Sequence, residues 1–163
     1  MTATVPTALS VTLNWYELWM ATQVGVKRHL EALQRNLPDR HGCDPDDGWS
    51  VHIEGAAGEM AAAKAMNRFY SGSVNTFRDG GDVGAIQVRT RSKDGYELIV
   101  RANDRDSDVF VLVVGRAPVY RVMGWMRGQD AKRAEWRKEH GGRVAAYFVP
   151  TAALRAMGEL DRE

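Results

Sequence analysis

Six consecutive apolar residues, from Val109 to Val114, constrain the fold of this 163-residue chain more than any other feature. The run shows no alternation of apolar and polar side chains, so a strand formed by it must be covered on both faces. Further strands are expected over 119–126 and 144–149. The pattern therefore predicts a central sheet with a layer on each side, in which the segment 108–114 is a buried inner strand.

The first part of the chain has helical periodicity. A short extended piece, 8–13, is followed by Asn14 and Glu17 in the spacing of a capping box, which predicts a helix from Trp15 to Leu33. Apolar and small residues recur along it at three- and four-residue intervals and form one stripe, which could pack on the core or serve a homodimer. The stripe consists of Trp15, Leu18, Trp19, Thr22, Val26, His29, Leu30 and Leu33.

A second helix is predicted from Trp49 or Ser50 to Met66, because the segment is rich in alanine. Gly55 and Gly58 weaken a helix and are expected where it packs closely. The strands 85–90 and 96–101 flank the turn sequence Lys93-Asp94-Gly95, which predicts a hairpin. A late helix is predicted over 128–139. The whole chain, 1–163, is expected to be one α/β (α+β) domain with a central mixed sheet flanked by helices.

Composition excludes several classes of protein. No window approaches the length of an apolar membrane span, and the first 13 residues lack a signal-peptide pattern. The single cysteine, Cys43, cannot form an internal disulfide, so a reducing, cytoplasmic location is expected. Four aspartates between 39 and 48 lack the alternate spacing of a calcium loop and indicate a solvated acidic loop. The net charge of +1 requires any nucleic-acid role to depend on a local patch.

Two segments contain candidate catalytic or metal-binding residues. Glu59 lies on the second helix among small residues three and four positions away, so its own helix offers no cation for its carboxylate. It must find a cation, a donor or a metal elsewhere, or lie exposed. Asp82 ends a glycine-rich turn, and Gln87 and Arg89 follow on one face of the next strand. The oxygen atoms of Asp82 and Gln87 could bind a divalent metal, and the Arg89 cation could bind a phosphodiester. The alternative is that these residues form only the polar, solvent-exposed face of a hairpin.

The order of these parts resembles the PD-(D/E)XK phosphodiesterase superfamily, which has the restriction-endonuclease-like fold. The resemblance rests on Glu59, Asp82, Gln87 and Arg89 and covers about 50–149, and the layout is similar to small phage-encoded members. It implies a Mg²⁺ (or Mn²⁺) ion held by Asp82, the Gln87 side chain and the Val88 carbonyl, with help from Glu59. Arg89 would take the place of the lysine that orients water or steadies phosphate.

Two residues depart from the family pattern. Gln87 replaces an acidic ligand, which should weaken metal binding, although glutamine occurs in active members. Arg89 replaces lysine and cannot accept a proton from water, because the guanidinium pKa is too high. Lys93 or Lys64 could substitute in space. Asp79 is an alternative to Asp82 as metal ligand, since the glycine-rich turn leaves the register open.

A local excess of basic residues agrees with this resemblance. Seven basic residues and three acidic ones lie between 121 and 143, as expected of a surface that follows phosphates or of a solvated helix face. The expected function is a metal-dependent DNA nuclease, encoded by a phage. The alternatives are a weakened nuclease fold that binds DNA or a protein without cutting, and a phage structural protein. Candidate DNA contacts are Arg91, Lys93, Arg101, Lys132, Arg133, Arg137 and Lys138.

Overall fold

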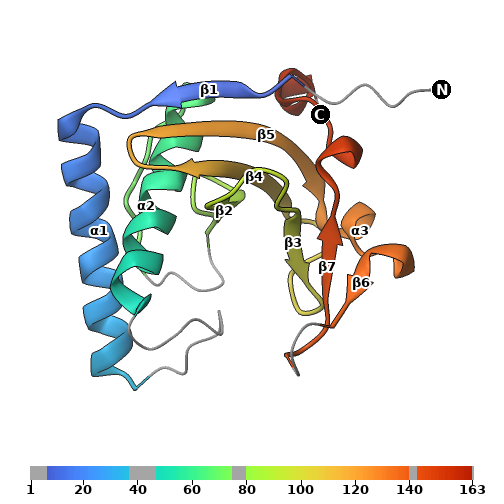
Figure 1. The fold of residues 1–163 in the computed structure, drawn as a ribbon, viewed down its shortest axis with the longest axis horizontal. Helices are drawn as coiled ribbons and strands as arrows, with labels where there is room; N and C mark the ends of the chain where they lie inside the picture. Colours follow the sequence, from blue (N-terminus) through green and yellow to red (C-terminus); the bar gives the residue numbers. More distant parts are fainter. Residues whose placement is uncertain (1–6, 37–46, 75–79, 140–142, 163) are drawn as a thin grey trace.

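The computed structural model describes residues 7–36, 47–74, 80–139 and 143–162 of the chain. It is a mixed α+β fold in which two long helices, a four-stranded sheet and a three-stranded sheet lie side by side (Figure 1). The acidic loop with Cys43, and Asp79, lie outside the described residues. No helix in the described segments is long and apolar enough to cross a membrane.

The larger sheet has the strand order β1-β5-β4-β2. Strand β4 pairs with β2 in parallel and with β5 antiparallel, and β5 pairs antiparallel with β1. Strand β2 is therefore an edge strand. The four strands are β1 (Leu9–Thr12), β2 (Ile86–Arg91), β4 (Val109–Arg116) and β5 (Val119–Arg127).

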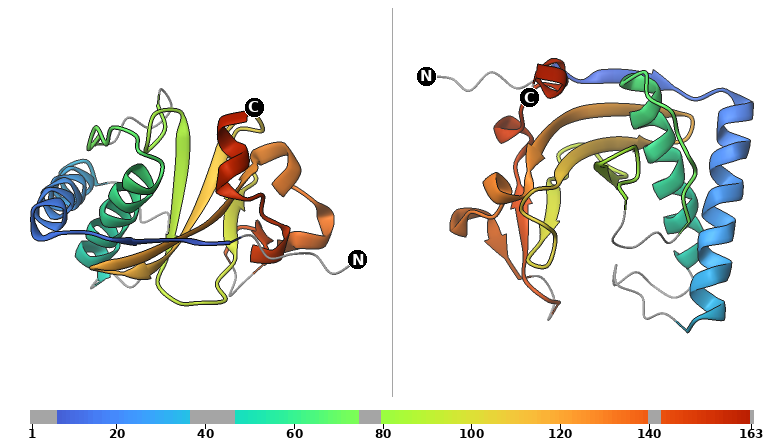
Figure 2. Two further views of the ribbon diagram at one scale, coloured as in Figure 1. Left: turned by 90° about the horizontal axis from the view of Figure 1, so that it is seen from above. Right: turned by 180° about the vertical axis from the view of Figure 1, so that it is seen from behind.

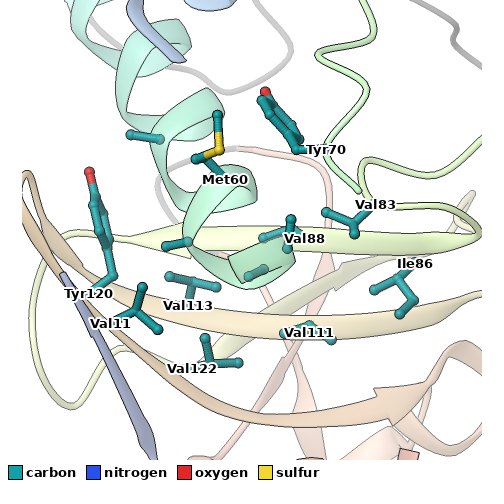
Figure 3. Packing of buried hydrophobic residues seen from close by; sticks show 14 of the residues in the cluster. Val11, Met60, Tyr70, Val83, Ile86, Val88, Val111, Val113, Tyr120 and Val122 are labelled. Carbon is teal, nitrogen blue, oxygen red and sulfur yellow. The ribbon is translucent and has the colours of Figure 1, made fainter. Parts of the chain in front are cut away.

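The predicted central strand is confirmed. In β4, Val111 and Val113 belong to the core between the sheet and the helices, whereas Phe110, Leu112 and Val114 belong to a second core on the opposite face. All five side chains are buried. Figure 3 shows the first of these cores, in which valines from several strands pack beneath the second long helix.

The two long helices stack on one face of this sheet, with α2 (Gly48–Ala65) inside and α1 (Trp15–Gln34) outside (Figure 2). The predicted capping box of Asn14 and Glu17 is present at the start of α1. Close approach depends on glycine at two points. A Cβ at Gly25 would lie 2.5 Å from the backbone of Ile53 in α2, and one at Gly58 would lie 1.9 Å from the Thr90 hydroxyl of β2.

The predicted apolar stripe of α1 is only partly on the buried side. Ala21 and Gly25 are buried against α2, and Leu18 and Val24 pack on the core. The larger side chains of the stripe face outward instead, because the close contact at Gly25 fixes which side of α1 meets α2. The exposed members are Trp15, Trp19, Leu30 and Leu33.

The predicted hairpin is wrong. Its turn exists, since the Tyr96 N–H donates to the Lys93 carbonyl at 3.3 Å, but the two strands do not pair with each other. Strand β3 (Leu98–Arg101) pairs with β7 (Ala146–Val149) in the second sheet, which β6 (Arg137–Lys138) completes. Leu98 and Val100 thereby pack on the second face of β4. Strand β2 cannot cover this face, because it lies beside β4 in the same sheet.

The predicted helix over 128–139 is also wrong. The chain forms only the short helix α3 (Gly128–Ala131) and a 3-10 turn, Ala134–Trp136, before it enters β6. The ammonium of Lys132 is bonded to the carbonyls of Ala102 and Asp104 and to the Asp106 carboxylate. These tertiary contacts outweigh helix propensity and direct the chain toward β7.

Candidate functional site

Glu59 of α2 is the one charged residue that is buried in the part of the chain that the structure describes. It is 6% exposed, and Arg28 of α1 binds both its oxygens, with Nη1 at 2.6 Å from Oε1 and Nη2 at 2.7 Å from Oε2. The Tyr70 hydroxyl donates to Oε2 at 3.1 Å. The cation that Glu59 lacks in its own helix therefore comes from the neighbouring helix.

Arg28 also fixes the chain that follows α2. Its Nε and Nη2 atoms donate to the Ser73 carbonyl at 3.1 and 2.6 Å. One guanidinium thus joins α1, α2 and the segment leading to the glycine-rich turn. Sequence reasoning did not single out Arg28, although it follows Ala21 and Gly25 at helical spacing on the side of α1 that faces α2.

Asp82 lies beside the free edge of β2. Its backbone N–H donates to the Ile86 carbonyl at 2.8 Å, and its Oδ2 accepts from the Val88 N–H at 2.7 Å. Because the N–H and C=O of a residue in an extended strand point to the same side, the Val88 carbonyl faces this edge as well. Within the described part of the chain, Oδ1 of Asp82 accepts no hydrogen bond.

Glu59 and Asp82 are close enough to influence each other's charge. The pKa of Glu59 is raised to about 7, because burial and the negative charge of Asp82 together outweigh the lowering effects of Arg28 and Tyr70. Burial also raises the pKa of Asp82, although the Val88 N–H, Arg89 and Arg28 favour its charged form. Arg28 thus favours the charged form of both carboxylates and Arg89 that of Asp82, and additional positive charge would relieve the repulsion between Glu59 and Asp82.

The resemblance implies that Glu59, Asp82, Gln87 and Arg89 act in one site, and the structure brings them only partly together. Ile86 and Val88 face the helices, so Gln87 and Arg89 point to the opposite face of β2. There Arg89 binds Asp104 at 3.1–3.2 Å and lies 5.0 Å from the centre of the Phe110 ring. Asp82, at the edge, lies between Glu59 on one face and Arg89 on the other.

A cavity of about 500 Å³ adjoins this cluster. An arginine, two serines and three glycines line it together with Phe69, whose side chain is 86% exposed. Ser73 connects the cavity to Arg28, and Gly81 connects it to Asp82. The sequence analysis did not single out this group. Its lining residues are Arg68, Phe69, Ser71, Ser73, Gly80, Gly81 and Gly84.

The predicted DNA contacts are spread over the turns and strands around the second sheet. Lys93 is exposed, whereas Lys132 is held by the turn 102–106. Several of the others are paired with acidic or aromatic side chains, so they do not form an unopposed basic helix face. These pairs are Arg91–Tyr96, Arg133–Glu135, Arg137–Glu139 and Lys138–Glu97. Arg101 is likewise not without a partner.

Among the residues that the structure describes, no three histidine, cysteine, aspartate or glutamate side chains form a metal-binding group. Comparisons with protein-family models, with curated proteins and with solved structures give no match. The candidate site is therefore defined by its own geometry and charge.

We predict that Glu59 makes stability depend on pH. A carboxyl group whose pKa is about 7 when folded and 4.5 when unfolded stabilises the protein most below pH 4.5, and this contribution is lost as the pH rises through 7. Relative to Glu59→Gln, the wild type should lose about 3 kcal/mol of unfolding free energy across this window. Denaturant unfolding of both proteins at a series of pH values measures it. Parallel curves would contradict the assignment.

Proposed function

We propose that this protein is a metal-dependent nuclease that hydrolyses phosphodiester bonds in DNA, with a restriction-endonuclease-like fold. The observation that carries the proposal is the pair of coupled carboxylates, Glu59 and Asp82, with raised pKa values beside a cavity. Titratable groups perturbed by burial and by a neighbouring charge are typical of functional sites. The separate positions of the four motif residues leave membership of the PD-(D/E)XK superfamily a proposal.

The donor atoms at the edge of β2 fit a Mg²⁺ ion of the kind that protein carboxylates and substrate phosphates bind together. Such sites use one or two protein carboxylates and retain several water ligands. Asp82 would hold the ion with the Val88 carbonyl, and Gln87 could reach it only around the strand edge. When bound, the ion would activate a water molecule and stabilise charge on the phosphate.

The other residues of the site have distinct roles under this proposal. Glu59 cannot be a direct ligand while Arg28 binds both its oxygens, so it contributes negative charge and fixes Arg28. In the cavity, Arg68 and the two serine hydroxyls offer donors to a phosphate, and Phe69 offers a face on which a base can stack. Arg89, bound to Asp104, holds one side of β2 in place.

A second candidate function is DNA binding without cleavage. The specific observation in its favour is that Arg28 already neutralises Glu59, while an amide occupies the position of the second acidic ligand at Gln87. A site with only one available carboxylate can hold a phosphate group through Arg68 and still bind metal too weakly for catalysis.

A cleavage and binding assay separates these candidates. The purified chain is incubated with supercoiled plasmid and with single-stranded oligonucleotide, in the presence of Mg²⁺, Mn²⁺ or EDTA. Cleavage that EDTA abolishes supports the nuclease. Binding that weakens with salt, without cleavage in either metal, supports the second candidate. If the chain neither cuts nor binds, both proposals are wrong and a phage structural role becomes the remaining expectation.

A further inference from the structure

The outer face of α1 is apolar over most of its length. Nine residues of this helix are exposed, and six of them are large and apolar. These six are between 51% and 84% exposed. The apolar residues are Trp15, Tyr16, Trp19, Met20, Leu30 and Leu33, and the polar ones are Gln23, Lys27 and Gln34.

These side chains form one continuous surface. At 3.6 residues per turn, all nine lie within one arc of the helix, opposite Ala21, Gly25 and Arg28, which face α2. Figure 1 shows α1 as the outermost layer of the fold, with α2 on its inner side. An exposed apolar patch of this extent is unusual on a monomer and indicates an interaction surface.

We propose that a second copy of this chain covers the outer face of α1, in a homodimer with two-fold symmetry. The area agrees with a dimer. Aromatic side chains bury about 150–250 Å² each, so the six apolar residues alone offer on the order of 600 Å² per copy. A stable interface buries about 800 Å² per partner, and the polar side chains on the same face supply most of the difference.

The sequence of the face is self-complementary when two α1 helices pack antiparallel about Gln23. Tyr16 then meets the partner's Leu30, and Trp19 meets the partner's Lys27, because each pair is equally far from the centre. The one charged side chain of the face thus lies against an indole ring, a favourable cation–π contact. The two Gln23 amides meet at the axis and can bond to each other. A lipid surface would instead leave Gln23 and Lys27 in the middle of the buried face, which favours the protein partner.

The oligomeric state of the full-length chain tests the proposal. Sedimentation equilibrium over a wide concentration range should show a dimer for the wild type. Trp19→Glu should raise the dimer Kd at least ~100-fold, since central aromatic residues dominate interfaces. Val144→Glu is the matched control, because Val144 is 91% exposed but lies far along the chain from α1. A wild type that is monomeric at every concentration, or a dimer unaffected by Trp19→Glu, would overturn the proposal.

Crosslinking tests the register independently of any effect on folding. In a Cys43→Ser background, Gln23→Cys should form an intermolecular disulfide. Trp19→Cys and Lys27→Cys should each crosslink poorly alone, since like positions are about 12 Å apart along the axis, and well when mixed. Absence of all these crosslinks would overturn the two-fold antiparallel arrangement. A monomer whose tryptophan fluorescence shifts on anionic vesicles would show a membrane-binding face instead.

Discussion

Arg28→Met should lower the free energy of unfolding by about 3–5 kcal/mol at pH 8, the range expected when one partner of a buried ion pair is removed. Arg28 is the guanidinium that Glu59 and Asp82 share, and it also donates to the Ser73 carbonyl. Without it, Glu59 loses the cation that binds both its oxygens, and of the two arginines that favour the charged form of Asp82 only Arg89 remains. The loss should be smaller at pH 5, because burial then keeps more of Glu59 in its neutral form.

A double variant and a matched control sharpen this prediction. Arg28→Met combined with Glu59→Gln should recover at least half of the lost stability, since it removes the stranded charge. Arg35→Met, in the exposed pair with Glu31 at 3.8 Å, should change stability by less than about 0.5 kcal/mol. Denaturant unfolding measures all three. An Arg28→Met effect equal to that of Arg35→Met would show that the buried ion pair does not stabilise the fold.

Asp82→Asn should abolish magnesium-dependent cleavage, if the wild type cuts DNA, and leave stability unchanged or slightly higher. Asparagine retains an oxygen that can accept the Val88 N–H, so the local backbone is preserved. It removes the negative charge that a metal requires, and it relieves repulsion with Glu59. Substitutions of residues around metal ligands typically cost 10–100-fold, so loss of a ligand should reduce the rate by more than ~100-fold.

The control for this prediction is Asp94→Asn, a chemically identical change in an exposed carboxylate that pairs with Arg121. Its cleavage rate and melting temperature should equal those of the wild type. Glu59→Gln should also abolish cleavage, but it leaves the buried Arg28 guanidinium without its bidentate partner and should therefore lower stability as well. Full activity of Asp82→Asn would exclude the proposed metal position, and a large loss of thermal stability would show that Asp82 is chiefly structural.

Sequence patterns predicted correctly those helices and strands that are determined by residues close together along the chain. The capping box at Asn14 and the unalternating run 109–114 each contain enough information to define an element and its burial. The hairpin prediction failed because the turn at Lys93–Gly95 is compatible with two pairings. The choice depends on which strand covers the second face of β4, a contact remote in sequence.

The candidate site was predictable to a similar extent. The lack of a cation for Glu59 on its own helix follows from its small neighbours, whereas its burial was one of two alternatives, and Asp82 beside the strand follows from the glycine-rich turn. The identity of the compensating cation does not, because Arg28 is 31 residues away along the chain. The position of Arg89 on the opposite face from Glu59 depends on how α2 lies on the sheet, which no local pattern records.

The hydrogen bond between Asp82 and the Val88 N–H also bears on self-association. Strand β2 is an outer strand, and the unpaired N–H and C=O groups of such strands are templates for pairing with other chains. Here a carboxylate, rather than a neighbouring strand, occupies the middle of that edge and brings negative charge to it. We therefore expect the residue that is proposed to bind metal also to protect the sheet against aggregation, so that Asp82→Ala should reduce solubility as well as activity.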